Sequence, residues 1–422
     1  MARNIWNLYV EITYFGFVFG ILQTFLSVYV IRLGANNTVI GLLNALPSLV
    51  FAVWSIPAAR LVEQNARRMR LILISGSLHR LGVAALGLMP FVVVGFRPEA
   101  AVIIVTLMTI PQVVANIGFS SMFADVVPAD YRARTVAVRS MLLGITMTLA
   151  SYLGGQFLGL SAESYRGPLD AIFAFPLNYQ FLFIFGFGLS LAGMVYLSRV
   201  RVSDGERAST PRSESGGGSL PSRLRAFVAL IVGEREFSRY TLAMFILHWG
   251  LFLPIPLYSL YWVRTLHASD SFVGLILTVQ NITTIVVYPL LPGMARRMGN
   301  RGLLALAALL ISLYPLITAF VTTLEPLLLI SVIGGAGGAM FGLASFNLLL
   351  EVSPAVRRPS FIATFNSAAF TAGFIAPFLG TELLNFIDIN QDLFFGGVLR
   401  LLGFLALILL VGVSGKPGRG GV

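Results

Sequence analysis

Long apolar stretches alternate with short polar segments along the whole chain of 422 residues. Each stretch runs for about 20 residues or more, the length that a helix needs to cross the hydrocarbon core of a bilayer. The stretches are apolar on every face, whereas the strands of a membrane barrel would alternate apolar and polar residues. Because backbone groups in hydrocarbon must be paired within their own segment, we predict helices.

The pattern predicts twelve membrane-spanning helices, six on each side of a long polar segment near the middle of the chain. The first six are expected at Trp6–Leu33, Thr38–Val62, Leu71–Phe96, Ala100–Phe123, Thr135–Leu160 and Asn178–Val200. The last six are expected at Tyr240–Leu266, Ser271–Ala295, Leu303–Thr323, Pro326–Leu350, Phe361–Phe386 and Asp392–Val413. We therefore expect an all-α membrane protein, with six-helix bundles over residues 1–200 and 240–422 and a cytoplasmic linker over residues 201–239.

The composition agrees with this pattern and excludes several classes of protein. Hydrophobic residues make up 57% of the chain and charged residues 11%, against about 25% charged residues in soluble domains. A soluble enzyme, a disordered chain and a coiled coil are thereby excluded. The chain has no cysteine and three histidines, so we predict no metal site and no cofactor.

The net charge of +11 is explained by where the basic residues lie. If both termini are on one side of the membrane, 22 Lys and Arg residues fall on that side and 4 on the other. Basic residues collect in cytoplasmic loops, so we predict cytoplasmic termini and a multi-pass protein of the plasma (inner) membrane. The positive charge is thus explained without binding to nucleic acid, and it favours contact with anionic lipids.

The two halves of the chain carry an internal repeat. TVIGLL at residues 38–43 resembles SFVGLI at residues 271–276, and Gly41 matches Gly274 at an offset of 233. DVVPA at residues 125–129 resembles EVSPA at residues 351–355 at an offset of 226, which also aligns Gly154 with Gly380. Matches at a constant offset in equivalent spans indicate a duplication, so the two bundles are expected to be pseudo-symmetric.

Three sequence patterns resemble those of the major facilitator superfamily. ARLVEQNARR, residues 59–68, is similar to the superfamily signature G-x-L-a-D-R-x-G-R-R between spans 2 and 3. Ala59 and Gln64 replace the first Gly and the first Arg of that signature. ADVVPADYRAR, residues 124–134, fits the pattern that ends span 4 and opens span 5. ASYLGG, residues 150–155, keeps part of the pattern G-P-x-x-G-G, which is associated with antiporters of the superfamily.

The resemblance implies secondary active transport of a small molecule by alternating access, within one chain that acts as a monomer. The sequence has no ATPase motif, so an ion gradient must drive transport, and we predict coupling to protons. The partial antiporter pattern favours efflux, and uptake of a sugar or nutrient is the alternative. An intramembrane enzyme and a non-transporting receptor are alternatives of other classes, and we predict a transporter rather than an enzyme.

Acidic residues at the cytoplasmic ends of even-numbered spans lie near basic clusters. We hypothesise that these groups form ion pairs that latch the outward-facing state and break when the bundles rock. The alternative is positive-inside anchoring by exposed arginines, each of which contributes little energy. The candidate latch residues are Glu63, Arg67, Arg68, Asp125, Arg132, Arg134, Arg301, Glu351 and Arg358.

Placing an ionisable residue inside a span costs free energy, so such residues are candidates for function. Glu11, Arg139 and His248 lie on spans 1, 5 and 7, which line or flank the central cavity in this fold, and are proton-coupling candidates. For Glu11 the alternative is a buried pair with Arg139, and for His248 a satisfied core position. Arg80 is expected to find a polar partner or to snorkel. Neutral side chains that could bind substrate, or hydrogen-bond between helices, are Asn44, Gln112, Asn116, Gln280, Asn281, Asn347 and Asn366.

Overall fold

The computed structural model describes residues 2–65, 67–160, 173–201, 233–354 and 358–412. Most of the predicted linker, residues 202–232, lies outside this part of the chain. The described residues form helices joined by short turns, and no strand is found among them.

The N-terminal half contains six long helices. They are α1 (Ala2–Arg32), α2 (Asn37–Gln64), α3 (Arg68–Val92), α4 (Arg97–Val126), α5 (Ala129–Gly159) and α6 (Leu177–Ser198). Each of the six predicted spans of this half corresponds to one of these helices, with ends that differ by a few residues.

The C-terminal half contains the other six spans, some of them in several helical pieces. The pieces are α8 (Arg235–Phe252), α9 (Ile255–Leu260), η2 (Tyr261–Thr265), α10 (Asp270–Val287), η3 (Tyr288–Leu290), α11 (Leu291–Thr318), α12 (Pro326–Val352), α13 (Arg358–Leu383), α14 (Ile389–Ala406) and η5 (Leu407–Val411). The seventh span runs through α8, α9 and η2, and Pro254 and Pro256 lie where α8 gives way to α9. Proline removes a helical hydrogen bond, which accounts for the break.

Eleven stretches of the described chain are long and apolar enough to cross a membrane, and one of them covers two predicted spans. This stretch runs from Asp270 to Thr318 and is 49 residues long. Gly299 interrupts it with φ 71° and ψ 167°, a conformation that glycine adopts readily and other residues rarely. The chain reverses there, so the stretch contains spans 8 and 9, and the predicted all-α membrane protein is confirmed.

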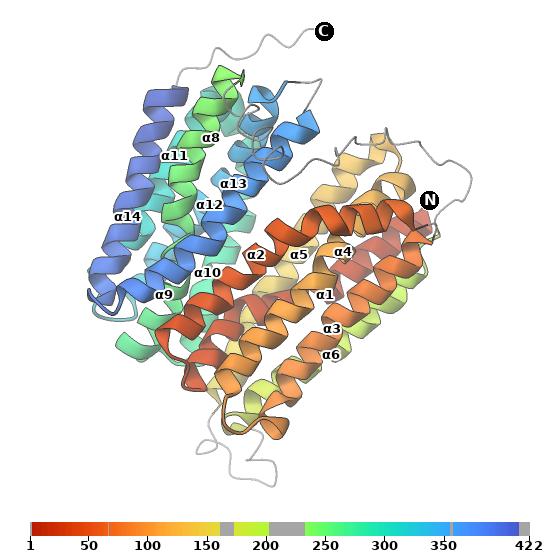
Figure 1. Ribbon diagram of the computed structural model, residues 1–422, viewed down its shortest axis with the longest axis vertical. Coiled ribbons are helices and arrows are strands. Elements are labelled where there is room, and N and C mark those ends of the chain that lie inside the picture. The colour runs from red at the N-terminus through yellow and green to blue at the C-terminus, as the bar shows by residue number, and fades with distance from the viewer. Residues whose placement is uncertain (1, 66, 161–172, 202–232, 355–357, 413–422) are drawn as a thin grey trace.

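The helices form two bundles that meet along two helix pairs (Figure 1). In the first half α1 packs against α5 and α6, α3 against α4 and α6, and α2 against α4. In the second half α11 packs against α12 and α14, and α8 against α13 and α14. The halves touch mainly through α2 with α13 and through α5 with α10. The internal repeat relates α2 to α10 and α5 to α13, so it relates these two pairs to each other.

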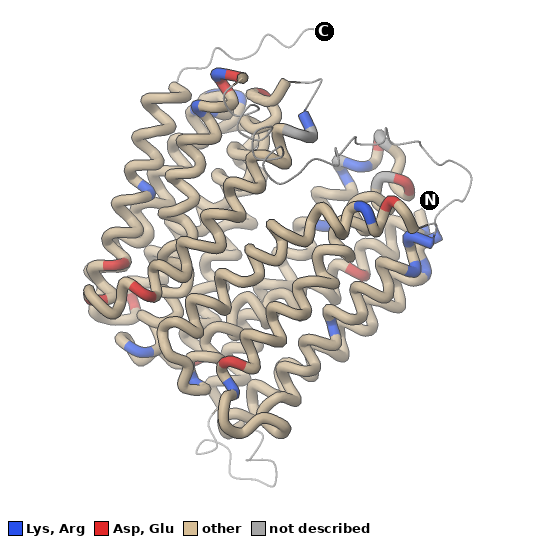
Figure 2. Tube along the Cα trace, viewed as in Figure 1, with Lys and Arg blue, Asp and Glu red and all other residues tan. Residues whose placement is uncertain are grey.

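Both chain ends of the described part lie on one side of the bundles, which we call the terminal side; the other is the opposite side (Figure 1). Charged residues gather toward these two sides, and the middle of the helices is almost uncharged (Figure 2). Large apolar side chains such as Leu81 and Phe185 are about half exposed, as expected of surfaces that face lipid. The chain is thus an integral, multi-pass membrane protein.

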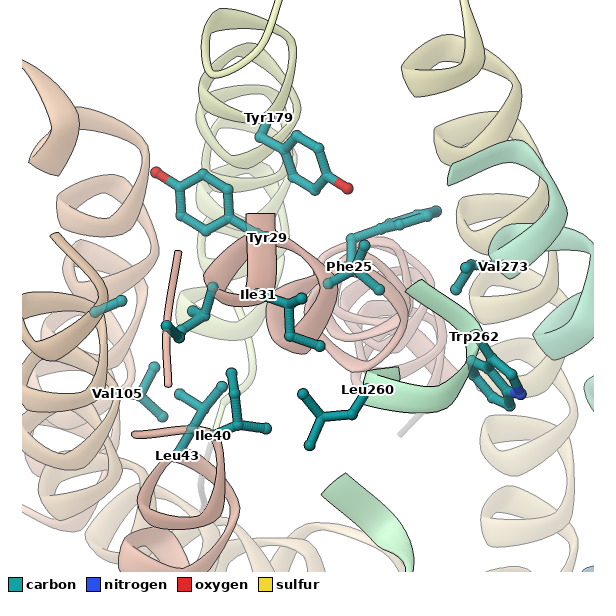
Figure 3. Close-up of a cluster of buried hydrophobic side chains, with 14 of the residues drawn as sticks. Phe25, Tyr29, Ile31, Ile40, Leu43, Val105, Tyr179, Leu260, Trp262 and Val273 are labelled. Carbon is teal, nitrogen blue, oxygen red and sulfur yellow. The ribbon is translucent and has the colours of Figure 1, made fainter. Parts of the chain in front are cut away.

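The largest buried cluster of apolar side chains joins the two halves (Figure 3). Phe25 and Tyr29 of α1 lie in this cluster with Leu260 of α9, Trp262 of η2 and Val273 of α10. Lipid tails are as apolar as these side chains, so close packing rather than removal from water must hold the cluster together.

Candidate functional site

Polar contacts join the two halves on the opposite side. Arg32, at the end of α1, donates from Nε to Asp270 Oδ1 at 2.8 Å, and its Nη2 lies 2.7 Å from the same oxygen. Arg264, at the end of the seventh span, donates from Nη1 to Asn37 Oδ1 at 2.7 Å and from Nη2 to the Ala35 carbonyl. These contacts hold the two halves together at that end.

The two arginine contacts are related by the internal repeat. Asn37 and Asp270 begin α2 and α10 and are separated by the repeat offset of 233. Arg32 and Arg264 each lie a few residues before these positions. None of these four residues was among the predicted site residues, although the repeat made the equivalence of Asn37 and Asp270 visible in the sequence.

Close backbone approaches lie beside these polar contacts. A Cβ atom added to Gly274 of α10 would come within 2.5 Å of the Ser151 carbonyl oxygen and 3.0 Å of the Gly155 Cα, both on α5. A Cβ atom on Gly41 of α2 would lie 2.0 Å from Thr381 Oγ1 on α13. Gly41 and Gly274 are the glycines that the repeat aligns, so the duplicated motif forms the contact at both edges of the opposite side.

The halves separate toward the terminal side (Figure 1). Near the middle of the helices Phe51 of α2 still stacks on Phe370 of α13, with ring centroids 5.6 Å apart. The hydrogen bonds and the ion pair described above between the two halves all lie on the opposite side. The described contacts between the halves therefore lie on the opposite side and near the middle of the helices, and the halves diverge toward the termini.

Three charged side chains meet inside the N-terminal bundle. Glu11 of α1 pairs with Arg139 of α5 at 3.1 Å and with Arg80 of α3 at 3.9 Å. Glu11 and Arg80 are each 5% exposed. Glu11 thus pairs with Arg139, and Arg80 has a polar partner; the role of Glu11 in proton coupling stays a prediction. The fold brings Arg80 to Glu11, a contact that the sequence did not predict.

A pocket of about 320 Å³ opens beside Arg139. Its lining comes from α1, α4 and α5: Ile12, Phe119, Ser120, Phe123, Val136, Arg139, Ser140 and Leu143. The helix contacts place α1 and α4 between α2 and α5, the two helices of this bundle that make most of the contacts to the other half. The pocket therefore lies on the wall that faces the C-terminal half. No group of three His, Asp or Glu side chains in the described part of the chain could hold a metal ion.

Comparison with known proteins agrees with this architecture. The sequence model of the Major Facilitator Superfamily matches residues 240–420, the C-terminal half. The structure of a D-xylose-proton symporter is similar over 99% of this chain and 98% of its own, with 16% identity and a TM-score of 0.71. The predicted resemblance to the superfamily is confirmed.

Other transporters share this superfamily fold. A nucleoside transporter is similar over 96% of this chain and 99% of its own, with 11% identity and a TM-score of 0.73. A POT family transporter in complex with 5-aminolevulinic acid covers 98% of this chain and 97% of its own, with 13% identity and a TM-score of 0.73. At these identities the likeness concerns the fold alone. No curated protein matches the sequence at a significant level.

The superfamily signature residues of the first half lie on the terminal side. Arg68 Nη1 is 3.5 Å from Asp125 Oδ2, and Arg132 donates from Nε to the Val127 carbonyl at 2.9 Å. Glu63, Arg67 and Arg134 are exposed. The Arg68–Asp125 pair is one of the predicted latch pairs and lies within one half; its role as a latch stays a prediction.

The equivalent residues of the second half have different partners. Glu351 accepts a hydrogen bond from Asn300, whereas the sequence suggested the neighbouring arginines. Arg301 instead pairs with Glu236 of α8 at 2.6 Å and donates to the Val411 carbonyl. Arg358 lies 3.5 Å from the Ser353 carbonyl that it donates to. Arg357 lies outside the described residues.

Replacing Asp125 with asparagine tests the latch. The change removes the carboxylate that Arg68 faces and keeps the shape of the side chain. We expect transport to fall about threefold to tenfold, because a partly exposed ion pair contributes up to about 1 kcal/mol. Transport is measured in proteoliposomes, and the amount of folded protein is checked by gel filtration. Unchanged transport would reduce Asp125 to an anchoring role.

The other predicted residues are spread over both halves. Asn44 donates to the Ile40 carbonyl of its own helix, and Asn347 donates to Asn300 Oδ1 at 3.4 Å. His248 is buried among Phe252, Phe341 and Phe365, and its Nδ1 lies 2.6 Å from the Met244 carbonyl oxygen. Of the remaining neutral candidates, the half-buried ones are Gln112, Gln280 and Asn281, and the exposed ones are Asn116 and Asn366. None of these neutral side chains lines the pocket beside Arg139.

Proposed function

We propose that the chain is a secondary active transporter that moves a small molecule by alternating access. The observation that carries this proposal is the one-sided closure: repeat-related contacts seal the opposite side while the halves diverge toward the termini. Rocking the halves about the middle of the helices would close the terminal side and open the other. Residues 1–200 and 240–422 are the two moving bodies in this proposal, joined by the linker over residues 201–239.

The excess of basic residues on the terminal side supports cytoplasmic termini in the plasma (inner) membrane, with anionic lipids in contact. The state described here is then inward-facing. One chain supplies both walls of the passage, so we propose a monomer. Alternating access needs no catalytic group, and we propose no enzymatic activity and no cofactor.

Coupling to protons is supported by the carboxyl group of Glu11. It is the one carboxyl group buried in the described part of the N-terminal half, and it contacts Arg139 beside the pocket. A buried ionisable group inside a span is a candidate for carrying a proton. We propose efflux as the direction, on the strength of the partial antiporter pattern at residues 150–155. Proton-coupled uptake is the second candidate, favoured by the fold shared with a D-xylose-proton symporter.

A flux assay in proteoliposomes tests the proposal. The vesicles contain a pH-sensitive dye and an imposed pH gradient, and the panel comprises amphipathic cations, amphipathic carboxylates, hexoses and nucleosides. We expect one class to collapse the gradient about tenfold faster with protein than without it. Radiolabelled flux of that class in both orientations of the gradient gives the direction.

The possible results separate transport from coupling. Flux that is independent of the pH gradient would remove proton coupling and leave alternating access intact. Vesicles that contain folded protein and show no flux for any class would contradict the transporter proposal.

A further inference from the structure

The cluster of Glu11, Arg80 and Arg139 is not electrically neutral. It contains two guanidinium groups and one carboxylate, so its net charge is +1 when all three are ionised. Among the described residues, no other carboxylate pairs with either arginine. Burying an uncompensated charge inside a membrane-spanning bundle costs free energy. The excess positive charge therefore points to an anion that binds there during the transport cycle.

The two arginines differ in how their donors are used. Arg80 donates from Nε to the Ser190 carbonyl at 3.1 Å and from Nη1 to the Gly76 carbonyl at 3.0 Å, in addition to facing Glu11. These contacts link α3 to α6, and we therefore assign Arg80 a structural role. Arg400 of α14 shows the same use of carbonyl partners, because it donates to Gly250, Leu251 and Ile311.

Arg139 retains donors for a ligand. Its Nη1 donates to the Leu8 carbonyl at 2.5 Å and its Nη2 donates to Glu11 Oε2 at 3.1 Å. A guanidinium group has five N–H donors, and the described residues provide acceptors for two of them. Unlike Arg80, Arg139 lines the pocket on the wall that faces the other half.

The pocket itself is suited to an amphipathic molecule. Its volume of about 320 Å³ corresponds to that of about ten water molecules. Ile12, Phe123 and Leu143 make much of it apolar, and Ser120 and Ser140 add hydroxyl groups. The Phe119 ring, 4.6 Å from Arg139 Cζ, covers one face of the guanidinium and leaves its edge for a planar anion.

We propose that this pocket is a binding site for an amphipathic monocarboxylate, with Arg139 holding the carboxylate and the apolar wall holding the rest of the molecule. The guanidinium fork matches the two oxygens of a carboxylate. Binding brings the charge of the cluster to zero, whereas a cation would raise it to +2. The inference rests on the proposed function, because it names the substrate class of that transporter.

Binding to the purified protein in detergent tests the site. The probes are 4-phenylbutyrate, its uncharged amide and the corresponding amine, measured by isothermal titration calorimetry. We expect the carboxylate to bind at least about tenfold more tightly than the amide, because a charge-assisted hydrogen bond is lost in the amide. The amine should bind most weakly.

Variants locate the binding to Arg139. Arg139→Gln should weaken phenylbutyrate binding about tenfold to a hundredfold and leave amide binding unchanged. Glu11 keeps Arg80 as a partner in this variant, and a cooperative unfolding transition confirms that the variant is folded. The matched control is Arg199→Gln, which loses the same charge in the same half, where Arg199 lies over the Tyr196 ring on the terminal side.

The inference is overturned if the carboxylate and the amide bind equally, if phenylbutyrate does not bind, or if Arg139→Gln binds it with wild-type affinity. The assay needs neither a membrane nor a gradient. Failure to bind would therefore leave the transporter proposal standing, and binding without flux would contradict transport alone.

Discussion

Replacing Gly274 with leucine is expected to prevent closure on the opposite side and to reduce transport about tenfold to a hundredfold. The new side chain would clash with the Ser151 carbonyl oxygen and the Gly155 Cα of α5. Both are backbone atoms, so no change of side-chain rotamer can relieve the clash. Forcing extra atoms into a packed contact costs about 1–3 kcal/mol. Here the penalty applies only to the state described above, so the equilibrium shifts toward the state that is open on the opposite side.

Cysteine labelling measures this shift, because the natural chain has no cysteine to interfere. Ala35 is 3% exposed on the opposite side and accepts a hydrogen bond from Arg264. In an Ala35→Cys background, Gly274→Leu should raise the rate of reaction with a membrane-impermeant maleimide about tenfold. The matched control is Gly338→Leu on α12, where an added Cβ would meet no atom within 4 Å.

Labelling and transport must change together for this explanation to hold. A Gly274→Leu protein that transports at the wild-type rate would show that the close approach of α5 and α10 is not needed. Equal labelling of the two glycine variants would contradict the proposed shift.

Replacing Glu11 with leucine is expected to lower the free energy of unfolding by about 3–5 kcal/mol. The variant leaves Arg80 and Arg139 buried together without a carboxylate, and like charges then face each other inside the bundle. Arg139→Leu should cost less, because Glu11 keeps its contact with Arg80. The order of the two effects is therefore part of the prediction.

Unfolding by dodecyl sulfate in mixed micelles measures these free energies. Glu63→Leu removes an exposed carboxylate of the same half and should change stability by no more than about 0.5 kcal/mol. A Glu11→Leu protein as stable as the Glu63→Leu control would mean that Arg80 and Arg139 find other partners. An Arg139→Leu protein less stable than Glu11→Leu would reverse the assigned roles.

The spans were predictable because their apolar length is set by the bilayer and not by partners elsewhere in the fold. The repeat also predicted the symmetry of the assembly, since Gly41 and Gly274 occupy equivalent contacts at the two edges of the opposite side. Spans 8 and 9 run together in the structure as one helical stretch, yet Gly299 turns the chain at the loop that the sequence indicated.

The partners of the charged residues were harder to predict. A helix that is apolar on every face gives no sign of which way it is rotated, so nothing in the sequence showed that Arg80 of α3 faces Glu11 of α1. Glu351 bonds to Asn300 while the next residue, Arg301, reaches Glu236. Which of two adjacent residues faces a given partner depends on how the end of the helix is rotated about its axis. The periodicity of the sequence does not fix this rotation.

The duplicated halves have diverged where they fasten together. Arg32 holds a carboxylate, whereas Arg264 holds a neutral amide and a carbonyl. Dissolved ions weaken the first kind of attachment much more than the second. The two arginine contacts therefore respond unequally to the ionic strength of the surrounding solution, and the Arg32–Asp270 contact between α1 and α10 is the one that weakens first.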